Sequence, residues 1–307
     1  MEKIDFVITY LDNTDKNWQN NYKIYSRIEK KKYDPNNVRF RSWNNFKYVL
    51  RSIDKNLPFI NNLFIIVSSE EQIPEYINKN NVKIIYHKDI IPEEYLPTFN
   101  SNTIELFLYN IKELSENFIY SNDDIFITNE MTANEFFDEN MNPKIQVVEK
   151  RVTDKNVYIS TLRKTQKLAN KENKDFKLQS ALSLLRSNHS MNPMKKSIWE
   201  YYWNKYSKYI SSNITRFRDA KNITQELSNY HLFMNYTINN INAFGTRQSK
   251  YFNFIKKTTE DLTHFINDKN ITSICINDYG VIDFNIYKKE VNKILEKKYP
   301  NKCKYET

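Results

Sequence analysis

Residues 118–127, FIYSNDDIFI, place two adjacent aspartates, Asp123 and Asp124, between two apolar runs. Paired carboxylates repel each other and resist leaving water, so an apolar frame on both sides is unfavourable unless a cation or a hydrogen-bond network compensates them. Asn-Asp-Asp is also a good turn sequence, because these side chains bond to nearby backbone. The stretch alone therefore leaves two interpretations open, a turn between strands and a metal site.

The segments upstream of this stretch alternate between strand-like and helix-like patterns. Short β-branched and aromatic runs at residues 4–11, 63–68 and 82–87 predict buried strands. Apolar residues recur at helical spacing in residues 43–56 and 101–114, which predicts two helices. The alternation predicts an α/β fold with a Rossmann-like, mostly parallel sheet, in which ligands gather at the carboxyl ends of strands.

Downstream of residue 150 the pattern becomes mainly helical. Residues 161–186, the aromatic run 199–206 and residues 225–241 predict a helical insertion. Residues 271–278 predict a strand that returns to the sheet, and residues 284–298 predict an amphipathic C-terminal helix.

We therefore expect three parts, with one intertwined domain as the alternative. They are an α/β part at residues 1–150, a helical part at 151–270, and a return strand with a C-terminal helix at 271–307.

Composition narrows the class of protein. The formal net charge of +9 predicts attraction to nucleic acid, a membrane surface or phosphorylated molecules. No zinc-ligand spacing, RNP-type motif or arginine stripe supports nucleic acid, so no such partner is expected. The two cysteines, Cys275 and Cys303, are too few for a disulfide framework, and neither stands at a metal-type spacing from a histidine.

No apolar run approaches the ~18 residues needed to span a bilayer, and the N-terminal residues turn polar too soon for a signal peptide. We expect a cytoplasmic protein. Peripheral contact with the inner membrane surface is an open alternative.

Four aspartates stand at the ends of expected strands: Asp12, Asp123, Asp124 and Asp278. Carboxylate and diphosphate oxygens are the ligands that hard divalent cations prefer. This acidic motif after a hydrophobic strand resembles the metal site of nucleotide-sugar transferases.

Longer blocks resemble the Stealth family of hexose-1-phosphate transferases. The blocks fall in order along nearly the whole chain. They are IDFVITYLDNTDKNW at residues 4–18; RFRSWNNFKYVLRSI, LPTFNSNTIE and LSENFIYSNDDIFI within residues 39–127; NHSMNPMKKSIWE and TRFRDAKNIT at 188–200 and 215–224; and CINDYG at 275–280. This chain has Asn13 where glycine is common in the family's opening block.

The resemblance implies a reaction. A sugar-1-phosphate would pass from a nucleotide diphosphate sugar, such as a UDP-N-acetylhexosamine, to a hydroxyl of a glycan, with release of a nucleoside monophosphate. Bacterial relatives build phosphodiester-linked capsules, and the compact length of this chain is typical of them, so capsule or surface-polysaccharide synthesis is expected. The first part would then bind the nucleotide sugar, the helical part would hold the acceptor and catalytic groups, and contact with the capsule assembly machinery is open.

Two rival functions remain. A conventional metal-dependent glycosyltransferase would use the same nucleotide and metal but release a nucleoside diphosphate. A basic protein that binds nucleic acid or a membrane surface would need no metal.

The resemblance also implies roles for particular residues. His189 is expected as general base and Arg218 as the fixed cation for phosphoryl charge, with Asp123 as their catalytic partner. Mg²⁺ or Mn²⁺ is expected on Asp124 and Asp278, with help from Asp123.

A second group of residues is expected to contact the donor or the acceptor. The donor candidates are Asp5, Tyr10, Asp12, Arg39, Arg51, Asn122 and Arg216, and the acceptor or supporting candidates are Asn100 and Glu105. Structural alternatives accompany several of them. Asp5 and Asp12 suit backbone turns, Arg51 suits a salt bridge, and Glu105 suits the start or stiffening of a helix.

Overall fold

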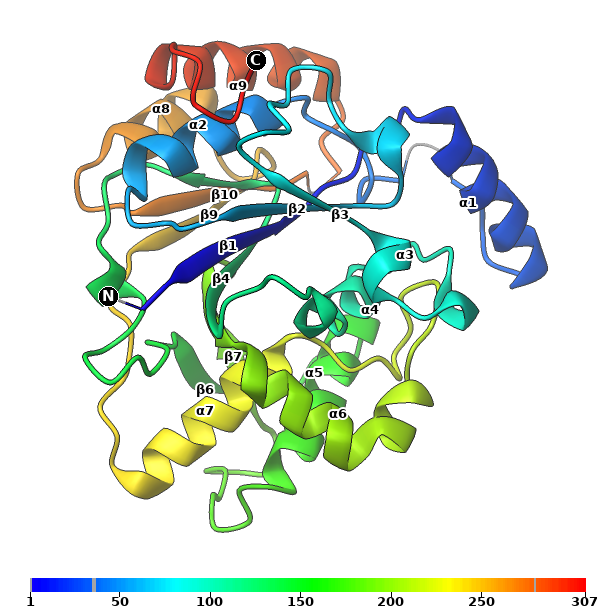
Figure 1. Ribbon diagram of the computed structural model, residues 1–307, viewed down its shortest axis with the longest axis vertical. Helices are drawn as coiled ribbons and strands as arrows, with labels where there is room; N and C mark the ends of the chain where they lie inside the picture. The colour runs from blue at the N-terminus through cyan, green and yellow to red at the C-terminus, as the bar shows by residue number, and fades with distance from the viewer. Residues whose placement is uncertain (1, 35–36, 279) are drawn as a thin grey trace.

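A five-stranded sheet crosses the middle of the molecule in the computed structural model, which describes residues 2–34, 37–278 and 280–307 (Figure 1). Its strand order is β3-β2-β1-β4-β8. Four strands are parallel, namely β1 (Ile4–Thr9), β2 (Leu63–Val67), β3 (Lys83–Tyr86) and β4 (Asn117–Asn122), and β8 (Asn192–Lys195) pairs antiparallel to β4. The predicted α/β class with a mostly parallel sheet is confirmed.

Two smaller sheets complete the β structure. One has the order β5-β10-β9, with β5 (Ile125–Ile127) antiparallel to β10 (Ser273–Ile276) and β9 (Ser249–Phe252) parallel to it. The other is the antiparallel pair of β6 (Val147–Arg151) and β7 (Ser183–Ser187). The expected strand near residue 275 therefore exists, but the prediction that it returns to the main sheet was wrong, because β5 takes it as a partner.

Helices cover the sheets from both sides (Figure 1). One layer holds α2 (Phe46–Asn56), α8 (Thr259–Asn267) and α9 (Phe284–Lys298), and the opposite layer holds α5 (Val157–Asn170), α6 (Lys196–Ser211) and α7 (Glu226–Asn239).

Side chains on a strand alternate between faces, so β1 contributes side chains to two hydrophobic clusters, one on each face of the sheet. Phe6 and Ile8 belong to the cluster beneath α2 and α9, and Val7 belongs to the cluster with α5, α6 and α7.

Two expected helices are shorter than predicted. Residues 101–114 form only α4 (Ser101–Glu105) and a single 3₁₀ turn, η3 (Leu108–Asn110). In the predicted helix 161–186, α5 ends at Asn170, and the Asn173 side chain donates to the Ala169 carbonyl at 3.0 Å just beyond that end. The charged, helix-compatible composition downstream did not reveal the strand β7.

A further helix, α1 (Lys16–Ile28), stands at the side of the molecule (Figure 1). An aromatic cluster of Trp18, Tyr22, Phe99 and Phe217 joins it to the body. Short helical segments finish the chain path: α3 (His87–Ile90), η1 (Glu70–Gln72), η2 (Glu93–Tyr95) and η4 (Ala133–Glu135). Across the described residues, we find no helix with both the length and the apolar content needed to cross a membrane.

Candidate active site

Asp123 and Asp124 form a two-residue turn that links β4 to β5. The chain thus leaves the five-stranded sheet and enters the three-stranded one within two residues. The Asp124 carbonyl accepts a hydrogen bond from the Ile276 amide at 2.9 Å, which holds the turn against β10. The turn interpretation is therefore confirmed, and both carboxyls lie partly buried at the carboxyl end of β4.

The two oxygens of Asp124 have different surroundings. Oδ2 accepts from Cys275 Sγ at 3.3 Å and from Asn277 Nδ2 at 3.2 Å, and His189 Nε2 lies 3.9 Å away. Oδ1 is buried, and no donor among the described residues reaches it. A buried carboxylate oxygen without a donor is costly, so Oδ1 is an unsatisfied acceptor that a cation would compensate.

Burial and neighbouring charges set the pKa values of Asp123, Asp124 and His189. Burial, reinforced by the Asp124 charge, raises the pKa of Asp123 to about 7. Burial also opposes ionisation of Asp124, but His189, Cys275 and Asn277 outweigh it and lower the pKa of Asp124. Burial disfavours the imidazolium of His189, yet the Asp124 carboxylate prevails and raises the pKa of His189 above its usual value.

Asp124, His189 and Cys275 bring ligand atoms within 4.8 Å of one another, a group that could hold a metal ion. The spacing of Cys275 along the chain gave no sign of this group, because it is the pairing of β10 with β5 that sets Cys275 opposite Ile125. Burial raises the pKa of the Cys275 thiol well above its ordinary value, so this group donates to Asp124 as a neutral thiol.

Asp278 lies outside that group. Its carboxylate accepts from Arg41 Nε at 2.5 Å and from Nη2 at 2.7 Å, and its side chain is 3% exposed. The Gly280 amide also donates to it at 3.0 Å. The structure therefore does not bring Asp278 together with Asp124 as the expected metal pair, because Arg41 already compensates its charge.

Arg218 and Arg39 are two arginines whose charges act on each other. Arg218 is exposed and donates from Nη2 to Ser101 Oγ at 2.7 Å. Burial and the neighbouring Arg218 charge lower the pKa of Arg39. Neither guanidinium has a carboxylate within ion-pair distance among the described residues. Two unpaired arginines close together favour an anionic ligand.

Glu105 is a buried carboxyl that feels the charges of Arg218 and His189. It ends α4 and accepts a hydrogen bond from Tyr120 Oη at 3.1 Å. Burial raises the pKa of Glu105 to about 7, although the Arg218 charge opposes the rise. Asn122 Oδ1 lies 2.9 Å from the same hydroxyl and shares its single proton with Glu105, which connects Glu105 to the end of β4.

Sequence reasoning missed a second acid beside His189. Glu226, the first residue of α7, accepts from Ser187 Oγ and from Asn229 Nδ2. Burial raises the pKa of Glu226, while the His189 and Arg186 charges oppose the rise. An acid in the first turn of a helix is common in any sequence, so no local signal marked it.

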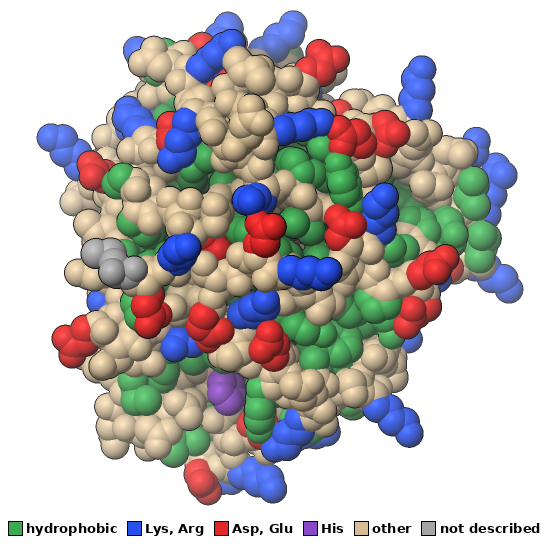
Figure 2. All heavy atoms as spheres, in the orientation of Figure 1, with side chains coloured by type: hydrophobic (Ala, Val, Ile, Leu, Met, Phe, Trp, Pro, Cys, Tyr) green, Lys and Arg blue, Asp and Glu red, His purple; other side chains and the backbone are tan. Residues whose placement is uncertain are grey.

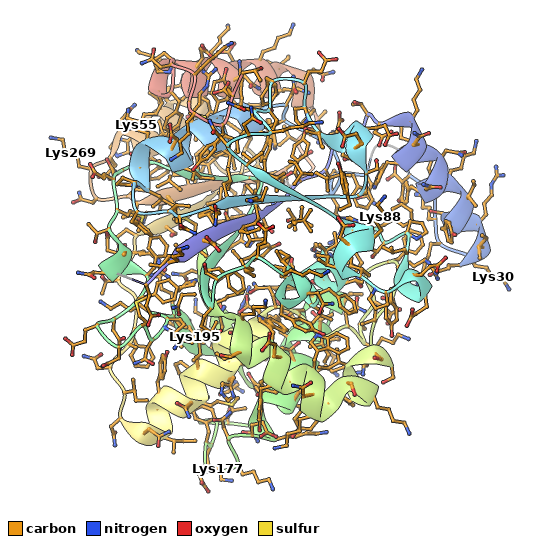
Figure 3. The ribbon with its side chains drawn as sticks, in the orientation of Figure 1. Lys30, Lys55, Lys88, Lys177, Lys195 and Lys269 are labelled. Carbon is orange, nitrogen blue, oxygen red and sulfur yellow. The ribbon has the colours of Figure 1, made fainter. Side chains whose placement is uncertain are left out.

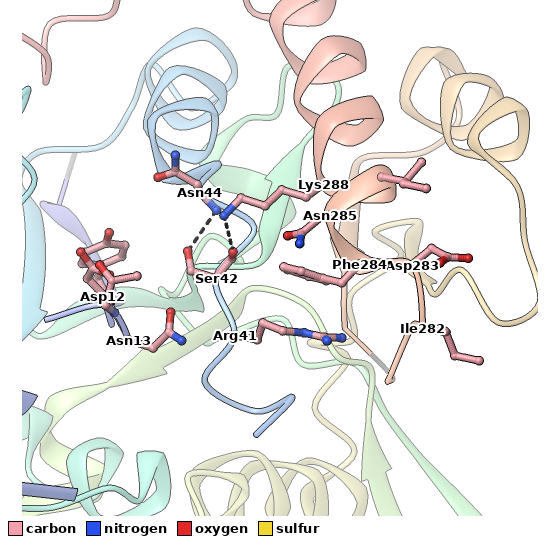
Figure 4. A pocket seen from close by; sticks show the side chains of 13 residues that line it. Asp12, Asn13, Arg41, Ser42, Asn44, Ile282, Asp283, Phe284, Asn285 and Lys288 are labelled. Atoms are coloured by element: carbon pink, nitrogen blue, oxygen red, sulfur yellow. Dashed lines mark hydrogen bonds between the residues drawn. The ribbon is translucent and has the colours of Figure 1, made fainter. Parts of the chain in front are cut away.

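A cavity of ≈ 690 Å³ opens between the β1 loop, residues 41–44 and the start of α9 (Figure 4). Tyr10, Asp12, Arg41, Phe284 and Lys288 belong to its lining, and Figure 4 shows Asp12 across the hollow from Phe284. Tyr10 stacks on Phe46 at 4.2 Å, and the Arg41 guanidinium lies 4.0 Å from the centre of the Phe284 ring. Asp12 also forms the expected turn, because its Oδ1 accepts from the Thr14 amide at 2.8 Å. The structure thus places Tyr10 and Asp12 together on one hollow.

Burial, together with the Asp12 and Asp123 charges, raises the pKa of Tyr10. Charges from the cavity lining and from the acidic turn therefore both act on Tyr10.

Two expected donor contacts have their charges compensated elsewhere in the fold. Asp5 accepts from Asn61 Nδ2 at 2.8 Å and from the Ser115 amide at 2.8 Å. Arg51 is buried and donates to both oxygens of Glu306, at 2.8 Å and 3.0 Å. The structure does not bring either residue to the acidic turn, because each completes a structural network.

Arg216 and Asn100 hold a loop in position near Arg218. Arg216 donates to the Glu94 carbonyl at 2.9 Å and to the Leu96 carbonyl at 3.1 Å. Asn100 caps α4 and donates to Asn222 Oδ1 at 2.9 Å. These bonds tie residues 94–101 to residues 216–222, which fixes the backbone that carries Arg218.

Comparison with known proteins gives consistent matches. Residues 39–145 match the family model described as Stealth protein CR2, conserved region 2. The chain is 37% identical to a capsular polysaccharide phosphotransferase of Actinobacillus pleuropneumoniae over 67% of this chain and 57% of that protein. It is 33% identical to one of Actinobacillus suis, over 90% of this chain and 77% of that protein. It is 30% identical to an exopolysaccharide phosphotransferase of Lactiplantibacillus plantarum, over 99% of this chain and 96% of that protein.

Among solved structures, the galactosyltransferase LgtC in complex with donor and acceptor sugar analogs aligns over 96% of both chains. The sequence identity is 10% and the TM-score is 0.41, so the alignment carries no functional argument.

Proposed function

The chain belongs to the Stealth family of capsular polysaccharide phosphotransferases, and on this premise we propose that it transfers a sugar-1-phosphate from a nucleotide diphosphate sugar to a glycan hydroxyl. The product is a phosphodiester linkage in a capsular or surface polysaccharide. The observation that carries the proposal is the corner where a donor-free, buried oxygen of Asp124 lies next to His189.

The residues of this corner fit a hard divalent cation. Asp123 and Asp124 Oδ1 supply carboxylate oxygens, and Mg²⁺ in proteins is held by one or two carboxylates together with substrate phosphates. A bound Mg²⁺ or Mn²⁺ would neutralise charge on the diphosphate. Asp278 has no part in this arrangement, because Arg41 holds it.

His189 acts as the base in the proposed reaction. The acceptor oxygen forms a new bond to the β-phosphorus of the donor as its proton passes to His189. The bond between the β-phosphorus and the α–β bridging oxygen breaks, and nucleoside monophosphate leaves. The Asp124 carboxylate, which raises the pKa of His189, stabilises the imidazolium that results.

Arg218 and Arg39 stabilise the phosphoryl oxygens, since both guanidinium groups lack a carboxylate partner among the described residues. The cavity beside Tyr10 and Asp12 takes the nucleoside of the donor, with aromatic and amide side chains to hold a base. We further propose that residues 1–150 bind the donor, residues 151–270 carry acceptor and catalytic groups, and residues 271–307 close the donor side.

A donor labelled in its β-phosphate tests the reaction. The label is expected in the polymer, with nucleoside monophosphate as the second product. A conventional glycosyltransferase would release nucleoside diphosphate and leave the label there, and that outcome would overturn the proposal. A panel of UDP-sugars and other nucleotide sugars in the same assay identifies the donor.

A further inference from the structure

One face of α1 is used to attach the helix to the body. Trp18 and Tyr22 point inward, and Trp18 packs edge-on against Phe40 with ring centres 5.0 Å apart. Tyr22 lies 5.3 Å from Phe99 by the same measure. The buried side of the amphipathic helix is therefore accounted for, and its outer side is not.

The outer face of α1 carries two exposed isoleucines. Ile24 is 43% exposed and Ile28 is 65% exposed, and they stand one helical turn apart. Residues four apart lie on the same helix face, so the two side chains form one apolar strip. Figure 2 shows hydrophobic side chains between lysines and arginines at the edge of the molecule where α1 projects.

Basic side chains surround this strip. Residues 23–32 contain five bases and a single acid: Lys23, Arg27, Lys30, Lys31 and Lys32 against Glu29. The acid is already matched, because Glu29 lies 3.4 Å from Arg216 Nη1. Lys31 lies 3.9 Å from Asp219. The other four basic side chains are exposed, and Lys30 lies at the far end of the helix (Figure 3).

We propose that this surface, α1 with residues 30–32, docks on an anionic lipid bilayer. Lysines and arginine bind the headgroups, and Ile24 and Ile28 enter the headgroup boundary. A nucleic acid or acidic polymer would match the charge but leave both isoleucines in water, whereas a bilayer takes both features at once. The inference does not rest on the proposed reaction.

Docking would also place the donor cavity near the membrane. The loop of Asp12, Asn13 and Thr14 lines the cavity, and Asp15 caps the start of α1 directly after it. Residues 12–15 therefore connect the cavity lining directly to the helix that would contact the membrane.

Vesicle sedimentation of the full chain tests the proposal. The protein is expected to bind vesicles of phosphatidylcholine mixed with phosphatidylglycerol and not vesicles of phosphatidylcholine alone. The triple variant Lys23→Gln, Arg27→Gln, Lys30→Gln should bind the mixed vesicles about a hundred-fold more weakly, at ~1 kcal/mol per basic side chain. Absence of binding by the unaltered protein overturns the inference.

A matched triple variant on α9 separates local from global charge. Lys289, Lys293 and Lys297 are exposed on one helix at a four-residue spacing, and their replacement by Gln removes the same net charge. This variant should keep most of the binding. Equal losses in the two triple variants would show that net charge alone acts and would overturn the assignment to α1.

A second pair of variants tests the apolar strip. The double variant Ile24→Asn, Ile28→Asn should abolish the part of the vesicle binding that survives raised salt. Ile255→Asn is the control, because this isoleucine is 58% exposed elsewhere on the surface, and it should leave that binding unchanged. Unchanged salt-resistant binding in the double variant overturns insertion. Equal thermal melts of all variants exclude a folding defect.

Discussion

Two groups of buried charge, one around Arg51 and one around Asp124, differ in how fully the protein compensates them. Arg51 donates to both oxygens of Glu306 and to the Tyr299 carbonyl at 2.8 Å. Asp124 has one oxygen with several donors and one with none among the described residues, and Asp123 is its immediate neighbour.

The difference separates structural charges from functional ones. A buried ion pair with complete partners costs little to keep and much to break. A carboxylate pair without full compensation destabilises the fold, and such destabilised groups cluster at sites that bind ligands. Replacement of charges should therefore harm catalysis near Asp124 and stability near Arg51.

The largest effect is expected from Asp124→Asn. The change removes the charge that would hold the cation and stabilise the imidazolium of His189, so turnover should fall at least about a thousandfold. Product formation from labelled donor measures this, and EDTA should have the same effect on the unaltered enzyme. Asp175→Asn, at an exposed aspartate, is the control. Normal turnover in Asp124→Asn would remove the corner from the mechanism.

His189→Ala should reduce transfer about 10²- to 10⁴-fold, the usual contribution of a general base. Donor binding, followed by calorimetry, should stay nearly intact, because the base acts on the acceptor hydroxyl. His264→Ala, at an exposed histidine, should change neither quantity. Equal loss of transfer and donor binding would contradict the role of His189 as base.

Arg51→Ala should lower the free energy of unfolding by about 3–5 kcal/mol, because it leaves the Glu306 charge buried without its partner. Denaturant unfolding measures the loss. Turnover per folded molecule should stay within a few-fold of the original. A large loss of turnover at normal stability would instead return Arg51 to the donor-binding candidates.

The smallest effect concerns Glu105. Its carboxyl is buried, as Arg51 is, and it feels the charge of His189, as Asp124 does. Burial raises the pKa of Glu105 to about 7 in the folded state, against ~4.3 in an unfolded chain. The folded state thus binds the extra proton, and stability declines as pH rises from the lower value through the higher one.

Glu105→Gln should therefore stabilise the protein by up to about 3 kcal/mol at pH above the folded pKa, and hardly at all at pH below ~4.3. Urea unfolding in acid and in mild alkali gives the two values. A gain of the same size in both conditions would show that the carboxyl does not titrate as described.

Local sequence patterns were enough for much of the fold. The runs that became β1, β2 and β4 and the helical spacing of α2 and α9 are properties of a few consecutive residues. The three-stranded sheet escaped prediction because β5 has only three residues and its partner β10 lies far along the chain.

The site shows the same limit. Asp124 and His189 could be named from their blocks, but Cys275 reaches Asp124 only through the pairing of β5 with β10. Sequence also left the role of Arg51 open between a donor contact and a salt bridge. The partner that occupies Arg51 is Glu306, next to the C-terminus, and no local pattern connects them.

The two-residue turn has a mechanical consequence. Asp123 and Asp124 join the end of β4 directly to the start of β5, so a ligand that draws their carboxylates together pulls on both sheets at once. The joint has no slack, because the Asp124 carbonyl is itself tied to β10. A ligand bound at Asp123 and Asp124 should therefore make β5 and β10 more rigid. Amide protons along these two strands should then exchange more slowly with deuterium, although they do not contact the ligand.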